Sequence, residues 1–144
     1  MIISAQLSHL DEIVAIENSS FEKPWSRKQI KDDIQTNINS ENWVFTLDRK
    51  VVGYIFGWIA QSEFHLHNIA VHPDHLRKNI GKKLIQHIIS KVVDQKVNVI
   101  LLEVSVNNIS ARKCYQSLGF VKGGVLKDYY SKGDDAILYN LEIN

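Results

Sequence analysis

The sequence predicts a single α/β (α+β) domain over residues 1–144, with elements in the order β-α-α-β-β-β-α-β-α-β-β. Two observations predict this class. A nearly continuous apolar run at residues 97–106, typical of a strand covered on both faces, lies between two segments with helical spacing. Earlier in the chain, the β-branched and aromatic segments 43–47 and 51–60 flank a short turn, which predicts a hairpin. The central strand–helix–strand unit therefore predicts parallel pairing, and the hairpins predict antiparallel pairing at the edges.

The N-terminal part is expected to hold one strand and two helices. Residues 2–6 are predicted to form the strand, and Ser8 to cap the first helix, with Asp11 completing a capping-box pattern. The second helix has a clearer start, because Ser26 is a good N-cap residue and Gln29 stands at the third helical position. Apolar periodicity and boundary residues predict the later elements: a strand at 64–71, a helix at 80–93, a helix capped by Asn107 or Asn108 that ends near Leu118, and closing strands at 120–126 and 136–143.

Composition limits the function classes. The formal net charge is only +1, which argues against a general nucleic-acid or membrane-surface binder. No window approaches the roughly 18 apolar residues that a membrane span needs. The single cysteine, Cys114, allows no internal disulfide, and the N-terminus has no charged leader, so a cytoplasmic protein is expected. Any anion site must come from local clustering of basic residues.

Such a cluster lies at the start of the predicted helix 80–93. Four basic residues fall close together there: Arg77, Lys78, Lys82 and Lys83. A helix start offers unpaired backbone N–H groups and the positive end of the helix dipole, and together these features form a phosphate cradle. Gly81 permits close backbone approach, and Asn79 tolerates positive φ. The alternative is a solvated cationic turn.

Two further residues are candidates for acid–base chemistry. Glu103 interrupts the apolar strand, where partial burial would suit a general base; the alternative is an ion-paired structural glutamate. Tyr115 lies on one face of the following helix and can serve in core packing, in hydrogen bonding at its tip, or in both. Cys114 is expected to be a small buried hydrophobe rather than a nucleophile. No metal site is expected, because the histidines lack a cysteine or carboxylate cluster that completes a zinc spacing.

Several stretches together resemble the GCN5-related N-acetyltransferase (GNAT) superfamily over nearly the whole chain. The stretches Asn68-Ile69-Ala70-Val71-His72-Pro73 and Tyr115-Gln116-Ser117-Leu118-Gly119-Phe120 are specific for the superfamily. The further combination with Pro24-Trp25-Ser26 and the pair Tyr129-Tyr130 is similar to the branch that acetylates a ribosomal-protein alanine.

This resemblance implies a mixed sheet that splays between its fourth and fifth strands, with acetyl-CoA entering the gap. It implies that Glu103 is the base and Tyr115 the acid. Residues expected to bind the cofactor are Ile69, Ala70, Val71, Arg77, Lys78, Asn79, Ile80, Gly81, Lys82, Asn108 and Tyr115. Residues expected to flank the substrate groove are Trp25, Tyr129 and Tyr130, with core packing as the alternative for Trp25.

The phosphate loop departs from the family pattern. Leu76 stands where the superfamily usually has Gln or Arg, and Asn79 replaces the first glycine, which puts cofactor affinity rather than the fold in question. The resemblance implies that the substrate is the N-terminal alanine of the small-subunit ribosomal protein numbered eighteen, and that the enzyme is a monomer or weak dimer without direct nucleic-acid contact. Two alternatives remain: the same chemistry on another protein N-terminus or a small-molecule amine, and a non-catalytic CoA-binding or interaction module.

Overall fold

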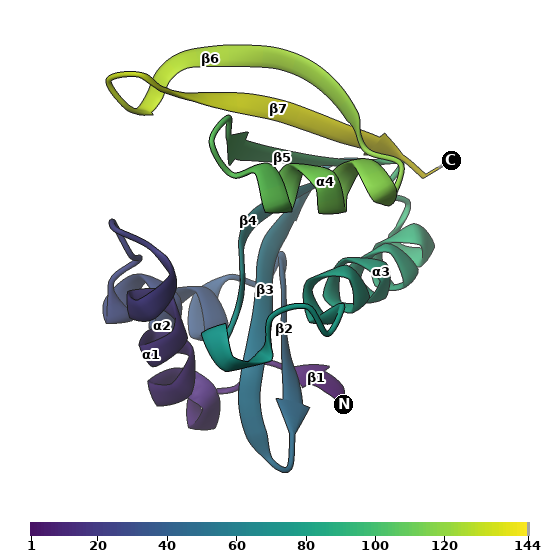
Figure 1. Ribbon diagram of the computed structural model, residues 1–144. Coiled ribbons are helices and arrows are strands. Elements are labelled where there is room, and N and C mark those ends of the chain that lie inside the picture. The colour runs from purple at the N-terminus through teal and green to yellow at the C-terminus, as the bar shows by residue number, and fades with distance from the viewer. Residues whose placement is uncertain (144) are drawn as a thin grey trace.

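The computed structural model describes residues 1–143 and shows one mixed seven-stranded sheet with helices on both faces (Figure 1). The predicted order of elements and the α/β class are confirmed. Short 3-10 turns lie at Leu7–His9, Pro73–His75 and Val93–Gln95. The main elements are β1 (Ile2–Ser4), α1 (Leu10–Ser20), α2 (Arg27–Thr36), β2 (Ser40–Leu47), β3 (Lys50–Ala60), β4 (Glu63–Val71), α3 (Ile80–Val92), β5 (Val99–Ser105), α4 (Ile109–Ser117), β6 (Val121–Ser131) and β7 (Asp134–Glu142).

The sheet has the strand order β1-β2-β3-β4-β5-β7-β6, and only β4 and β5 run parallel. Both predicted kinds of pairing are therefore confirmed. The parallel pair is short, because β4 and β5 are in register only at Glu63–Val99, Phe64–Ile100 and His65–Leu101. Beyond that point the two strands diverge, as Figure 1 shows, and the sheet is splayed as expected.

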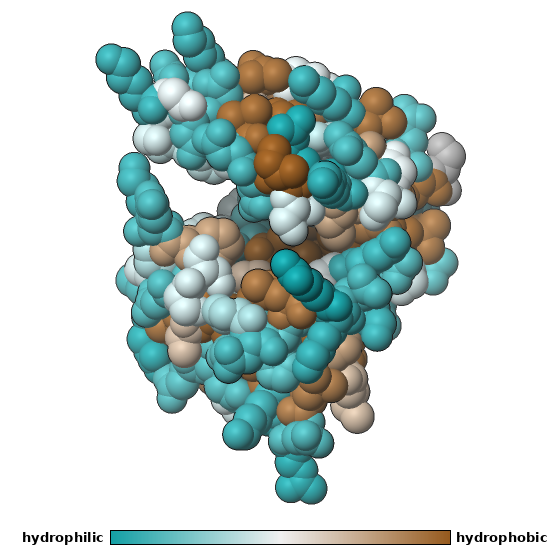
Figure 2. Space-filling view, viewed as in Figure 1, coloured by the Kyte–Doolittle hydropathy of each residue, from teal (hydrophilic) through white to brown (hydrophobic). Residues whose placement is uncertain are grey.

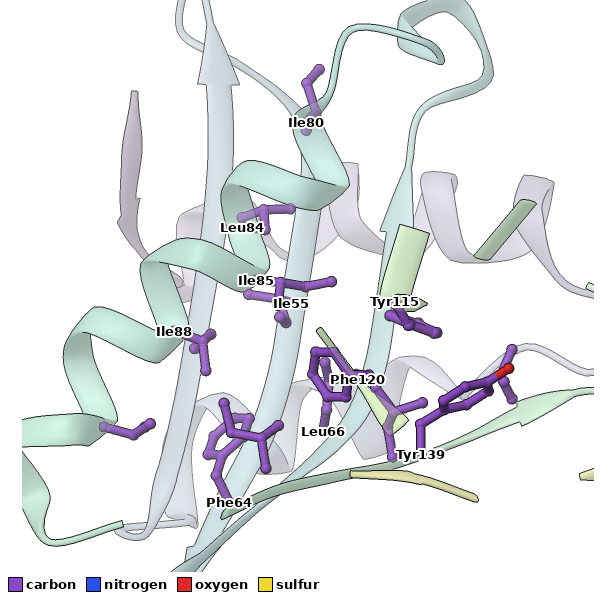
Figure 3. Packing of buried hydrophobic residues seen from close by; sticks show 14 of the residues in the cluster. Ile55, Phe64, Leu66, Ile80, Leu84, Ile85, Ile88, Tyr115, Phe120 and Tyr139 are labelled. Carbon is purple, nitrogen blue, oxygen red and sulfur yellow. The ribbon is translucent and has the colours of Figure 1, made fainter. Parts of the chain in front are cut away.

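Hydrophobic residues form two cores, one on each face of the sheet. In the first, α3 packs Leu84, Ile85 and Ile88 onto the β-strands, and the aromatic rings of α4 and β7 join the same cluster (Figure 3). The second core lies under α1 and α2 and includes Ile13 and Ile30. Each such fully buried aliphatic side chain contributes about 1.5–3 kcal/mol to folding.

Helix starts were predicted with mixed success. At α2 the prediction is confirmed, since the Gln29 N–H donates to Ser26 Oγ at 3.1 Å and the Ser26 N–H donates to Gln29 Oε1 at 2.7 Å. At α1 the prediction is wrong, because Ser8 lies inside a 3-10 turn that precedes the helix. There the Gln6 N–H donates to His9 Nδ1 at 3.0 Å, so a histidine satisfies this backbone group.

The expectation that β5 is covered on both faces is also wrong. Burial alternates along the strand, with Ile100, Leu102 and Val104 buried and Glu103 exposed. The reason is the splay, because α1 and α2 lie over β2, β3 and β4 and do not extend over β5. One face of β5 therefore borders the opening between the diverging strands.

Candidate functional site

A cleft opens where β4 and β5 separate. Figure 2 shows the molecule hollowed between the half that carries β5, β6, β7 and α4 and the half that carries α1 and α2. The last residues of β4 and β5 that pair with each other are His65 and Leu101, and the hollow begins beyond this pair. The predicted site residues belong to the elements that surround it.

The edge of β4 that faces the cleft carries free backbone groups. The His72 N–H donates to the carbonyl oxygen of Val52 in β3 at 2.8 Å. Bonded and non-bonded pairs alternate along an antiparallel ladder, so the N–H and C=O groups of Ile69 and Val71 point away from β3, toward the gap that β5 leaves. By the same alternation, the backbone of Ala70 faces β3. Two of the three β4 residues expected at the cofactor therefore present backbone groups to the cleft.

The loop before α3 adopts an unusual backbone conformation. Both Arg77 (φ 66°) and Asn79 (φ 60°) are left-handed, and Asn79 is the N-cap of α3. Positive φ was predicted to be accessible to Asn79, and the structure confirms that it adopts this conformation. The first bond of the helix runs from the Lys83 N–H to the Asn79 carbonyl at 3.0 Å, so the earlier N–H groups of the helix have no helical partner.

Space in front of this helix start is open. A Cβ placed on Gly81 would meet only one atom within 4 Å, Val71 Cγ2 at 3.9 Å. The packing of the chain itself therefore does not require glycine at this position. Glycine leaves the helix backbone open to the close approach of a ligand, and the free N–H groups of the first turn suit an anionic group such as a phosphate.

Basic side chains surround the same helix start. Arg77 and Lys78 are exposed, and Lys82 is partly buried. Within residues 1–143, neither Arg77 nor Lys82 forms an ion pair, so their charge is not neutralised by the chain. Burial raises the pKa of the Cys114 thiol, and the positive charge of Lys82 opposes that rise. Lys82 thus lies within electrostatic range of α4, on the other side of the cleft.

Asn108 lies at the start of α4. Its side-chain oxygen accepts the Ala111 N–H at 3.2 Å, which caps the helix as predicted. Because the side-chain oxygen is used in the cap, the amide nitrogen of this exposed residue is the group available for the expected contact with the cofactor arm.

Glu103 departs from the predicted environment. The sequence predicts a partly desolvated carboxylate, but the side chain is exposed, because the face of β5 on which it lies has no helix over it. It lies two residues beyond the last β4–β5 pair, at the start of the splay. Partial desolvation lowers the pKa of His67, as does the neighbouring His65, whereas the carboxylates of Asp33 and Glu103 act in the opposite direction. Glu103 therefore borders the cleft rather than a remote surface.

Tyr115 is buried in α4, with 6% of its surface exposed. Its ring packs against Phe120, with centroids 5.7 Å apart, and against Tyr139 at 6.2 Å (Figure 3). Burial is the main cause that raises its pKa above the usual value, with smaller contributions from Cys114 and Tyr130. Within residues 1–143 its hydroxyl forms no hydrogen bond, and it is not among the fully buried polar atoms that lack a partner. Tyr115 is thus a core residue that keeps its proton and has a free hydroxyl.

Tyr130 connects the two acid–base candidates. Partial burial raises its pKa to about 12, with the negative charge of Glu103 as the next cause. Since Tyr130 in turn affects Tyr115, it lies within electrostatic range of both residues. Its ring meets that of Tyr129 edge-on, with centroids 5.0 Å apart. The structure therefore brings Glu103, Tyr115 and Tyr130 to the same end of the cleft, with the more exposed Tyr129 beside them.

A pocket of about 480 Å³ lies on the α2 side of the sheet. Trp25 lines it, and the same ring also packs edge-on against Phe56 at 6.2 Å, so its groove and core roles coexist. The two tyrosines expected in the groove, Tyr129 and Tyr130, do not line this pocket. Its lining residues are Trp25, Gln29, Asp32, Asp33, Thr36, Asn37, Trp58 and His67.

The buried carboxylates within residues 1–143 are Glu17 and Asp33, which sequence reasoning missed. Glu17 accepts hydrogen bonds from the Tyr54 hydroxyl, from Asn68 Nδ2 at 2.7 Å and from the Trp25 N–H at 2.8 Å. A signal for both was present in the sequence. Glu17 follows Ile13 by four residues and Asp33 follows Ile30 by three, so helical spacing places each carboxylate on an apolar face.

Residues 1–143 contain neither a metal-ligand cluster nor a membrane-spanning helix. No group of three or more histidine, cysteine, aspartate or glutamate side chains in that range could hold a metal ion. No helix within it is long and apolar enough to cross a membrane.

Known proteins share the sequence and the fold. Residues 10–120 match the family model described as Acetyltransferase (GNAT) family. The ribosomal protein bS18-alanine N-acetyltransferase of Escherichia coli (strain K12) is 30% identical over 146 residues, which cover 99% of this chain and 97% of that protein. An N-alpha-acetyltransferase of Saccharolobus solfataricus is 36% identical over 109 residues, covering 67% of this chain and 65% of the relative.

Solved structures agree with this similarity. The crystal structure of the ribosomal-protein-S18-alanine N-acetyltransferase from Escherichia coli superimposes with a TM-score of 0.92 at 29% identity, covering 100% of this chain and 94% of that one. A Salmonella typhimurium protein solved with its cofactor acetyl-CoA shares the fold, with a TM-score of 0.87 at 16% identity and coverage of 100% and 94%.

Proposed function

The chain belongs to the acetyltransferase (GNAT) family, and we propose that this acetyl-CoA-dependent N-acetyltransferase acts on the N-terminal alanine of ribosomal protein bS18. The observation that carries the proposal is the position of Glu103, two residues beyond the last β4–β5 pair and beside the open edge of β4. Tyr130 lies within electrostatic range of both Glu103 and Tyr115. The coverage of 97% of a bS18-alanine acetyltransferase supports the choice of acceptor, because the elements that flank the acceptor side are included. Such an acceptor assigns the enzyme to the cytoplasm.

The residues present fit acetyl-CoA. The helix start of α3, with Arg77, Lys78, Asn79, Ile80, Gly81 and Lys82, would hold the pyrophosphate through backbone N–H groups and positive charge. The backbone groups of Ile69 and Val71 would bind the pantetheine arm and the acetyl carbonyl. Asn108 would contact the arm from the other side of the cleft. When bound, acetyl-CoA supplies an activated thioester.

The acceptor amine must be neutral before it can attack. A peptide α-amine has a reference pKa of about 7.7–8.0, against about 10.4 for lysine, so deprotonation at pH 7 costs about 1 kcal/mol for the former and about 5 kcal/mol for the latter. A single carboxylate is therefore sufficient for an α-amine. Glu103 would accept this proton directly or through one water, and its exposure on the cleft leaves room for either route.

Two other groups would complete the transfer. The Val71 N–H would stabilise the negative charge that develops on the acetyl carbonyl oxygen. The Tyr115 hydroxyl would donate its proton to the departing thiolate, and its raised pKa keeps that proton in place at neutral pH. Attack by the amine is direct, so Cys114 has no role in the chemistry.

The experiment that tests this proposal is an acetylation assay on synthetic N-terminal peptides, read by mass spectrometry. Peptides with the bS18 N-terminus are compared with peptides whose first residue is varied and with free polyamines. We expect the α-amine of the alanine peptide to be acetylated fastest. Preferred turnover of small amines, or acetyl-CoA binding without any acetyl transfer, would contradict the proposal.

A further inference from the structure

We propose that the pocket between α2 and the strands β3 and β4 binds a basic side chain of the acceptor peptide, through the carboxylate of Asp33. The inference rests on the proposed function, because it requires a polypeptide acceptor. It adds a binding subsite, and therefore a second sequence preference beyond the N-terminal residue.

The carboxylate of Asp33 is only half satisfied within the protein. Its Oδ1 accepts hydrogen bonds from Trp58 Nε1 at 2.8 Å and from Asn37 Nδ2 at 3.2 Å. Its Oδ2 is buried and has no hydrogen-bond partner within residues 1–143, and the whole residue is only 8% exposed. A buried charge without compensation is costly, so a cation that enters the pocket would remove an existing penalty.

The lining of the pocket offers negative charge and no positive charge. Asp32 is the second carboxylate, and its pairing with Lys28 at 2.7 Å is an exposed surface contact that contributes little. The lining contains no lysine or arginine. The lowered pKa of His67 leaves this residue uncharged at neutral pH. The pocket therefore favours a cation, although the chain as a whole is almost neutral.

Aromatic walls narrow the choice of cation. Trp25 and Trp58 both line the pocket, and 44% of Trp58 is exposed although its indole N–H is fixed by Asp33. The face of an indole ring attracts cations, and a planar guanidinium both stacks on such a ring and binds a carboxylate through its fork of N–H donors. An arginine side chain satisfies both features of the pocket, and a lysine ammonium satisfies the charge alone.

The position of the pocket fits the first residues of an acceptor. Asp33 and Glu103 both act electrostatically on the imidazole of His67, so the pocket and the proposed base flank a single side chain. An extended residue spans about 3.3–3.6 Å, and an arginine side chain is longer than that. His67 lines the pocket and lies two residues beyond His65, just as Glu103 lies two residues beyond Leu101, the partner of His65 in the last β4–β5 pair. An acceptor whose amine lies at Glu103 would therefore direct a side chain from its first few positions toward Asp33.

The test uses alanine-first peptides in which one arginine is moved through positions two, three and four, each paired with its citrulline counterpart. Citrulline keeps the shape of arginine and removes its charge. At one position we expect the citrulline peptide to have a KM about tenfold to hundredfold higher, the range for losing a charge-assisted hydrogen bond, with little change in kcat.

Enzyme variants provide the matched comparison. Asp33→Asn keeps the shape and an acceptor for Trp58, and it should remove the difference between arginine and citrulline peptides. Asp94→Asn, an exposed aspartate outside the pocket, should leave the difference unchanged. Thermal unfolding of both variants identifies any loss of folding.

The outcomes separate the two proposals. The subsite is overturned if arginine and citrulline peptides have the same KM at all three positions. It is also overturned if the Asp33→Asn variant keeps the preference for arginine. Either result leaves the proposed function standing. Absence of acetyl transfer to every peptide contradicts the proposed function. In that case calorimetric binding of the arginine and citrulline peptides to wild type and Asp33→Asn still decides the subsite, because equal affinities overturn it.

Discussion

The two sides of the cleft carry opposite charge and are built in different ways. On the α3 side, positive charge is exposed and comes from one stretch of chain, residues 77–82, which also supplies the backbone N–H groups. On the α2 side, negative charge is buried in Glu17 and Asp33, and some of its hydrogen-bond partners, Asn68 and Trp58, come from distant segments. A polyanionic co-substrate and an amine-bearing acceptor thus meet surfaces of opposite sign.

Because one charge is exposed and the other buried, residues on the α3 side should matter for ligand binding, and residues on the α2 side should matter for folding stability. Exposed cations without an ion-pair partner, such as Arg77 and Lys82 within residues 1–143, add little to folding. Buried carboxylates are part of the folded structure, since each one fixes neighbouring donors. Changes on the α3 side should therefore affect kinetic constants alone, whereas changes on the α2 side should affect stability as well.

The largest effect is expected at Glu103, where the two sides meet. Glu103→Gln should lower kcat by about 10²–10⁴-fold at neutral pH, because the general base is lost. The melting temperature should stay unchanged, since the side chain is exposed and packs into neither core. Initial rates measured across pH should show partial recovery at high pH, where the amine deprotonates without help. An unchanged rate at neutral pH would remove Glu103 from the mechanism.

A large effect on stability is expected at Glu17. Glu17→Ala leaves three buried or partly buried donors without an acceptor, from Tyr54, Asn68 and Trp25. Each buried donor that loses its acceptor costs about 1–3 kcal/mol, so denaturant unfolding should show a loss of about 3 kcal/mol or more. Glu142→Ala, at an exposed carboxylate, serves as the control and should change stability by less than about 0.5 kcal/mol. Equal values for the two variants would contradict the contrast drawn between the two sides.

Tyr115→Phe should lower kcat by about 10²-fold, the lower end of the range for general acid catalysis, and should retain the fold. The ring contacts with Phe120 and Tyr139 remain in the variant. Tyr139→Phe is the matched control, since the Tyr139 hydroxyl accepts a bond from Gln116 Nε2 at 3.2 Å. It should lose about 0.5–1.5 kcal/mol of stability and keep its kcat. A Tyr115→Phe variant that changed only the melting temperature would support the core-packing role alone.

The smallest effect is expected at the helix start of α3. Lys82→Ala should raise the KM for acetyl-CoA by about tenfold, because one of several phosphate contacts is lost. Lys83→Ala, at the exposed neighbour, should change it by less than about threefold. Added salt should reduce the difference between the two variants. The same KM for both would show that backbone N–H groups alone hold the phosphates.

Local features of the molecule were predictable from the sequence. Element order, the α2 cap and the left-handed Asn79 all depend on residues close together in the chain. The burial of Glu103 was predicted wrongly, because apolar neighbours in a strand do not reveal whether a helix covers the second face. The acidic pocket was missed for a related reason. His67 stands at a register shift between β3 and β4, and its proximity to Asp33 exists only after the sheet has formed.

The alternating edge of β4 gives this enzyme a built-in reporter. Amides bonded to β3, such as that of His72, should exchange slowly with solvent deuterium whether or not the cleft is filled. The amides of Ile69 and Val71 face the cleft and should be slowed only when acetyl-CoA lies against them. Neighbouring residues of one strand thus provide both the signal and its internal standard, so cleft occupancy can be followed amide by amide without attaching a probe to the protein.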